Sequence, residues 1–137
     1  MDQLNQSAVY GGMPPAVPMI PGTVTRPLNT AFQPSATRPA FVVYSVQTTV
    51  TASIAGGQNG DIFLESADDA AFTTNVRTLS VIGQGQTYTL AIALQGVQPQ
   101  SGVLAGMVDT GGWLRMRSSN NLGSPGYTFR AGAEILM

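Results

Sequence analysis

From Phe41 onward, apolar and polar side chains alternate with a period of two, the pattern of a β-strand with one buried face. The first such segment runs from Phe41 to Ile54. Its apolar face carries Val42, Tyr44, Val46, Val50, Ala52 and Ile54. Further strands are predicted at 61–66, 76–82, 86–94, 102–108, 113–118 and 127–135. About seven short strands with glycine-rich turns, and no long amphipathic helix, predict an all-β, β-sandwich or jelly-roll-like domain.

Glycine-rich segments separate the predicted strands. Asn59-Gly60 is predicted to form a hairpin turn, because this pair readily adopts positive φ. The other predicted separators are 83–85, 96–100, 109–112 and 120–126. Residues 67–72 are predicted to form a loop or a single helical turn, with Phe72 anchoring it in the core.

Proline dominates the chain before the first strand. Seven of the nine prolines lie between Pro14 and Pro39. Proline fixes φ, lacks an N–H and holds the preceding residue extended, so this segment is predicted to form neither a helix nor a central strand. The sequence therefore predicts two parts, an extended arm over residues 1–39 and a β-domain over residues 40–137.

The arm carries more large apolar side chains than an inert tail needs. Disorder in the isolated protein is one prediction, because proline-rich polar segments bury little surface. The favoured alternative is docking on a partner protein. The residues predicted to make that contact are Tyr10, Met13, Val17, Met19, Ile20, Leu28 and Phe32.

The chain is unusually poor in charge. Charged residues make up 9% of the sequence, against roughly 25% in an average protein. Lysine is absent, and the six arginines are scattered and outnumbered by seven acids, so nucleic acid is not an expected partner. A nearly neutral surface favours association, so a homo-oligomer is expected. Neither a signal peptide nor a membrane-inserting segment is predicted.

Most catalytic chemistry is excluded by residue type. Without His, Cys or Lys the chain cannot build a Ser-His-Asp triad, a Cys-His dyad, a Schiff base or a His or Cys zinc site. Paired carboxylates of the glycosidase kind remain, with Asp61, Glu65 and Asp109 as the available acids. Asp68-Asp69 is interpreted as a turn or cap instead of a Ca²⁺ site. No catalytic residue, cofactor or metal is therefore predicted.

One strand presents side chains typical of binding hot spots. Trp113, Arg115 and Arg117 alternate on one face, and Trp and Arg are enriched where interfaces bind most tightly. These three residues form the predicted contact patch. An equally weighted alternative is that Trp113 lies at the sheet edge and the two arginines are either solvated or paired with Asp61 or Glu65 across strands.

Several short segments resemble small β-structured virion proteins of tailed bacteriophages. The resemblance covers residues 26–137 and rests on 26–33, 44–46, 56–58, 62–65, 68–69, 72–75, 114–118, 127–130 and 132–137. It implies a virion component of the tail fibre, tail tip or capsid surface, in a class where β-modules commonly form trimers.

Together these observations predict a non-enzymatic virion protein. In the leading hypothesis the arm docks on other virion proteins, and the β-domain serves assembly or adsorption to a host glycan or protein in the tail fibre region. The first alternative is a capsid decoration protein. The second, from a different class, is a carbohydrate-active enzyme that uses paired carboxylates.

Overall fold

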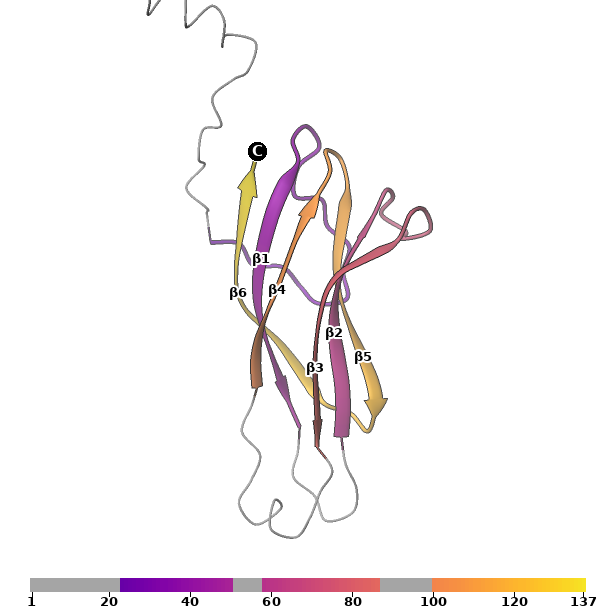
Figure 1. Cartoon of the computed structure of the whole chain (residues 1–137), viewed down its shortest axis with the longest axis vertical. Coiled ribbons are helices and arrows are strands. Elements are labelled where there is room, and N and C mark those ends of the chain that lie inside the picture. Colours follow the sequence, from indigo (N-terminus) through magenta and orange to yellow (C-terminus); the bar gives the residue numbers. More distant parts are fainter. Residues whose placement is uncertain (1–22, 51–57, 87–99) are drawn as a thin grey trace, which may run out of the picture.

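The structure, a computed structural model, describes residues 23–50, 58–86 and 100–137. Over those ranges the chain forms six β-strands and no helix, which confirms the all-β prediction (Figure 1). The strands are β1 (Ala40–Thr49), β2 (Gln58–Ala67), β3 (Arg77–Gln86), β4 (Gln100–Val108), β5 (Trp113–Leu122) and β6 (Gly126–Leu136). One of the seven predicted strands, at 86–94, lies outside the described residues except for Gln86, which is the last residue of β3.

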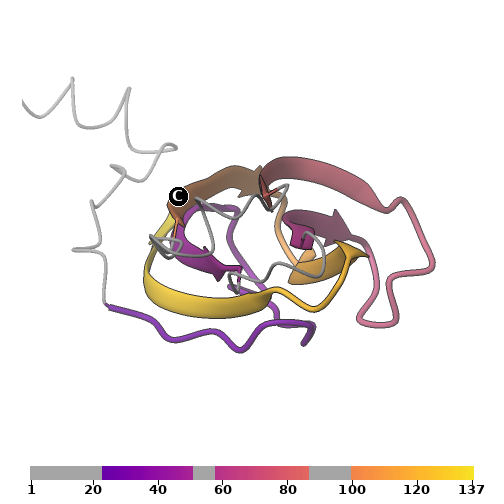
Figure 2. The same cartoon turned by 90° about the horizontal axis from the view of Figure 1, so that it is seen from below.

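The strands form two antiparallel sheets of three strands each. One sheet has the order β4-β1-β6 and the other has the order β3-β2-β5. Figure 1 shows the two groups of strands beside each other, and the end-on view of Figure 2 shows them enclosing a common interior. This layout is compatible with the predicted sandwich.

The interior is built from the apolar positions that alternate along the strands. Val42, Tyr44 and Val46 of β1 are fully buried, as their period of two predicts. The facing sheet contributes Ile62, Leu64, Leu114 and Met116, all without solvent exposure. A fully buried side chain of this size contributes about 1.5–3 kcal/mol, so this shared core is the main source of stability.

The two sheets meet directly along β3 and β4. A Cβ placed on Gly106 of β4 would lie 2.9 Å from Cβ of Leu79 on β3. A Cβ on Gly102 would lie 2.7 Å from Cδ1 of Ile82. Glycine at these two positions therefore lets β4 pack closely against β3.

The opposite side of the interior is crossed by residues 24–33, which we call the strap. Thr23, just before it, forms an isolated bridge with Ala133 of β6. At its far end, Phe32 exchanges two backbone hydrogen bonds with Leu114 of β5, at 2.8 and 2.9 Å. The strap thus runs from the free edge of one sheet to the free edge of the other, and Figure 2 shows it along the outside of β6.

The strap corrects the predicted division at residue 39. Phe32 is 7% exposed and belongs to the core, where its ring meets that of Tyr44 edge to face at 5.9 Å. Leu28 packs against the same core. Both were predicted to contact a partner, but their side chains are used within the domain. The prolines did exclude a helix and a long strand from residues 23–39, yet isolated bridges still hold this segment in place.

The predicted turns at 59–60 and 83–85 are wrong, because these residues lie inside β2 and β3. The glycines there make room for side chains from neighbouring strands. The hydroxyl of Tyr127 occupies the place where a Cβ of Gly60 would be, and the carboxylate of Asp61 does the same over Gly83. The predicted turn at 109–112 is confirmed, whereas the one predicted at 120–126 is limited to 123–125. Gly111 and Gly123 supply positive φ in these turns (74° and 65°).

Candidate contact site on the β3-β2-β5 sheet

An ion-pair network lies on the outer face of the β3-β2-β5 sheet. Glu65 of β2 is directly opposite Arg115 of β5 in the strand register, and Arg117 is two residues further along β5. Arg115 donates from Nη2 to Oε2 of Glu65 at 2.7 Å, and Arg117 donates from Nε to Oε1 at 2.9 Å. One carboxylate therefore holds two guanidinium groups, which is the cross-strand pairing predicted as the alternative to a contact patch.

The arginines also cover Glu65 and keep it ionised. The residue is only 5% exposed. Burial raises the pKa of its carboxyl, but hydrogen bonds from Arg115 and Arg117 outweigh burial and leave the pKa below its usual value. A carboxylate with both oxygens engaged has little capacity to transfer a proton or to attack a substrate.

Each arginine also lies over an aromatic ring. The guanidinium carbon of Arg115 is 4.2 Å from the ring centroid of Phe72, and that of Arg117 is 4.4 Å from the centroid of Phe63. We call Glu65, Arg115, Arg117, Phe63 and Phe72 the arginine cluster. It carries two positive charges and one negative charge, a net charge of +1. Ion pairing and stacking fix both guanidinium planes before any partner arrives.

Trp113 lies on the same face of β5 as the two arginines and is half-buried. In the register it is opposite Ala67, two pairs beyond Glu65 and Arg115. The three residues of the predicted contact patch therefore do lie together, next to an acid that two of them bind.

Phe72 does not anchor its loop in the core as predicted. It has a φ of 56° and is half-buried against Arg115 on the outer face. Asp69 supports the loop by accepting hydrogen bonds from the backbone N–H groups of Thr73 and Thr74, at 3.0 and 2.8 Å. These bonds give the Asp68-Asp69 pair the turn-forming role preferred in the sequence interpretation.

The remaining candidate acids do not assemble into a catalytic pair. Asp61 accepts a hydrogen bond from Nδ2 of Asn121 at 2.6 Å and lies along β2 from the engaged Glu65. Asp109 lies in the turn after β4, in a small pocket that it lines with Asp68 and Arg77. Across the described ranges no group of three or more acidic side chains could hold a metal ion.

A second buried network, which the sequence analysis did not identify, ties the strap to β6. Glu134 accepts hydrogen bonds from Arg26 at 2.7 and 2.8 Å and from the hydroxyl of Tyr44 at 2.7 Å. Burial raises the pKa of Glu134, but the Arg26 and Tyr44 hydrogen bonds outweigh it and lower the pKa overall. Burial is also the largest cause of the raised pKa of Tyr44. The available signal was a single acid in the apolar segment 131–137.

Five of the residues predicted to contact a partner lie outside the described residues: Tyr10, Met13, Val17, Met19 and Ile20. In the part of the chain that is described, no helix is long and apolar enough to cross a bilayer.

Comparison with known proteins gives one informative match. No family model matches the chain, and no solved structure matches it. Uncharacterized protein 443R of Invertebrate iridescent virus 6 is 32% identical over 127 residues. The match covers 85% of this chain but only 5% of the length of that protein. The chain is thus similar to one small part of a much longer viral protein.

Proposed function

We propose that this protein is a non-enzymatic structural module of a viral assembly, and that it binds a neighbouring protein through Trp113 and the arginine cluster. The observation that carries the proposal is the double pairing of Glu65 with Arg115 and Arg117, each stacked on a phenylalanine. In this arrangement both carboxylate oxygens of Glu65, one of the three candidate acids, are bound to arginine. The arrangement also presents a preorganised, positively charged surface beside a half-buried tryptophan.

A viral setting is supported by the similarity to protein 443R. The comparisons concern an iridescent virus and no tailed bacteriophage, so the proposal is stated for a viral assembly in general. Within it, the chain acts in the virion, as an adsorption module bound to other virion proteins or as a surface decoration protein. A sandwich domain and an anchoring N-terminal segment also belong to this proposal.

The chemistry of the surface defines the partner. Nη1 of each clustered arginine has no hydrogen-bond partner among the described residues. A partner carboxylate or a polar glycan oxygen can bind there while an apolar or aromatic group packs on Trp113. Because the guanidinium groups are already immobilised, binding loses little side-chain entropy.

The test is incorporation into virus particles, measured by quantitative mass spectrometry of purified virions from cells expressing each variant. Trp113→Ala should lower incorporation, because truncating a binding hot spot costs about 2 kcal/mol or more. Thr128→Ala, an exposed position on β6, is the control and should leave incorporation unchanged. Equal incorporation of the two variants contradicts the proposal. The wild-type copy number separates the two virion roles, since decoration needs many copies and adsorption needs few.

The enzyme alternative has its own test. Asp61→Asn preserves size and removes the charge, so a polysaccharide hydrolase that uses Asp61 loses its activity. We expect purified wild-type protein to release no reducing ends from host-surface polysaccharide. Release that disappears in Asp61→Asn would overturn the non-enzymatic proposal.

A further inference from the structure

The outer face of the β4-β1-β6 sheet differs in kind from the face that carries the arginine cluster. Three rows of register partners cross it. They are Phe41 with Met107 and Ile135, Val43 with Ala105 and Ala133, and Ser45 with Val103 and Ala131. We call these nine residues the apolar face. Eight of them are apolar, and none is charged.

The domain itself leaves much of this face open to solvent. Val103 is 57% exposed and Met107 is 51% exposed, although both are large apolar residues. A shallow hollow on the β6 side of the face is lined by Val43, Ser45, Ala131 and Ala133 together with Gly132 and Thr23. A sheet face that is open to water is normally polar, as the outer face of β2 and β5 is here. A contiguous uncharged apolar face of this kind marks an interaction site.

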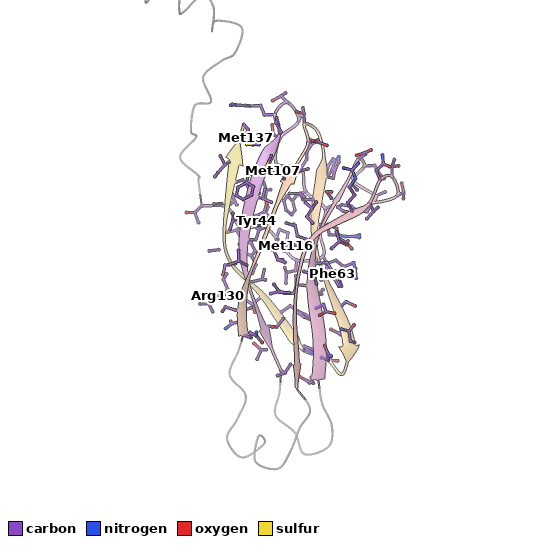
Figure 3. The ribbon with its side chains drawn as sticks, viewed as in Figure 1. Tyr44, Phe63, Met107, Met116, Arg130 and Met137 are labelled. Carbon is purple, nitrogen blue, oxygen red and sulfur yellow. The ribbon has the colours of Figure 1, made fainter. Side chains whose placement is uncertain are left out.

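The chemistry of the face favours a second copy of the same chain. Arg130 borders the face beside Ala131 and donates to Gln47 at 3.0 Å. Figure 3 shows Arg130 toward the opposite end of the molecule from Met107. A partner selected by charge would find nothing to pair with on the apolar face. Two identical uncharged faces meet without like-charge repulsion, and a two-fold axis brings the same patch of each copy together.

The side chains also suit close packing of one sheet on another. Small side chains leave depressions between larger ones on this face. The small residues are Ala105, Ala131 and Ala133, and the larger ones are Val103, Met107 and Phe41. The large side chains of one copy can fill the depressions above the alanines of the other copy at the usual sheet spacing of about 10 Å.

The size of the face sets the strength of the contact. Three strands at about 4.8 Å spacing, with the apolar face covering about 17 Å of each, give roughly 240 Å² per copy. Two copies then bury about 500 Å², well below the 1,200–2,000 Å² of a stable complex, so the contact is expected to be weak. We propose that the apolar face is a reversible self-association surface on which two copies of this chain pack face to face. The inference goes beyond the proposed function, because it concerns the opposite sheet and needs no other virion protein.

The first experiment measures the mass of the full chain by sedimentation over about 1 μM to 1 mM, the range for a contact of this size. Wild-type protein should pass from monomer to dimer. Met107→Glu should remain monomeric, because dimerisation would bury an unpaired charge. The matched control is Val81→Glu, which adds the same charge at a residue 52% exposed on the other sheet and should dimerise as wild type.

Two results overturn the inference. One is a wild-type chain that stays monomeric throughout, which is also the result expected if the chain's own N-terminal residues cover the face. The other is equal loss of dimer in Met107→Glu and Val81→Glu.

A second experiment covers the case in which Met107→Glu fails to fold. The chain has no cysteine, so a single introduced thiol reports only contacts between copies. Ser45→Cys, at the middle of the central strand, should give a covalent dimer with a short bismaleimide. Ser119→Cys, on the outer face of the other sheet, should give at least tenfold less. Equal yields from the two variants contradict face-to-face packing.

Discussion

Glu134 of β6 accepts two hydrogen bonds from the guanidinium of Arg26, which precedes it by 108 residues. Arg26 lies on the strap, and Glu134 is the only acid of β6. The guanidinium also stacks on the ring of Phe32, at 4.5 Å from its centroid. The ion pair therefore fixes the strap to one sheet while Phe32 fixes it to the core, so this proline-containing segment is part of the folded domain.

Glu134→Gln should destabilise the protein by about 1–3 kcal/mol, because it leaves the buried hydrogen-bonding groups of Arg26 and Tyr44 incompletely paired. Chemical denaturation would measure the loss. Asp109→Asn, the same change at an exposed turn, is the control and should have little effect. Equal stability of the two variants would contradict the role of Glu134 in holding the strap.

Stability should decrease in acid. Burial raises the pKa values of Glu65 and Glu134, but hydrogen bonds from their arginine and tyrosine partners leave both below the ordinary value of 4.5. As pH decreases below about 4.5, the unfolded state takes up protons first, so the stabilisation present above that pH is lost as each folded pKa is passed. Denaturant titrations between about pH 6 and pH 2 should show this decrease.

The double variant Glu65→Gln/Glu134→Gln should be less stable than wild type near neutrality and should lose less stability between those two pH values. Some dependence should remain, because backbone and side-chain hydrogen bonds from Thr74 and Thr73 lower the pKa of Asp69 as well. A double variant with the wild-type slope would show that neither network controls acid stability.

Phe32→Ala should cost about 3–5 kcal/mol, the usual cost of removing a buried phenylalanine side chain. The predicted boundary at residue 39 would make this substitution harmless to the β-domain. Leu28→Ala, at a partly buried position of the strap, should cost less. Thermal unfolding of the two variants tests whether Phe32 belongs to the core or to a separate arm. Wild-type stability in Phe32→Ala would support the predicted arm boundary at residue 39.

Two glycines of β6 provide a matched pair for close packing. A Cβ at Gly132 would lie 2.7 Å from a ring carbon of Tyr44, whereas one at Gly126 would make ordinary contact with Thr49 at 3.7 Å. Gly132→Ala should therefore destabilise the protein by about 1–3 kcal/mol, because the core would be overpacked. Gly126→Ala should be close to neutral. Similar unfolding midpoints for the two variants would contradict the tight packing of β6 on β1.

The sequence predicted the fold where one local pattern decides it. The alternation of Val42, Tyr44 and Val46 specifies a half-buried strand whatever lies opposite, and β1 has that form. The turn prediction at Asn59-Gly60 was wrong because glycine is favoured both in tight turns and where another side chain comes close to the backbone. Here the close side chain is Tyr127, which lies on a strand distant in sequence. Local residues do not encode such tertiary neighbours.

The candidate site was predicted in part: Trp113, Arg115 and Arg117 were named, whereas Phe63 and Phe72 were not predicted to belong to it. A spacing of two placed Arg115 and Arg117 on one face, and the sequence left open whether they face a partner or Glu65. Only the strand register, which puts Glu65 opposite Arg115, favours the ion pair. The Arg26 and Glu134 pair was missed because residues so far apart in sequence carry no periodic signal.

The order of strands in the β4-β1-β6 sheet has a consequence during translation. The central strand β1 is synthesised before both of its partners, and β2 and β3 lie between it and β4 in the chain. Until β4 is synthesised both edges of β1 present unpaired backbone groups, and the other edge stays unpaired until β6, which carries Glu134, is complete. Unpaired strand edges recruit other chains, so nascent copies on neighbouring ribosomes can exchange strands before either is complete. The rate at which residues 100–136 are synthesised therefore sets how long each copy is exposed to that error.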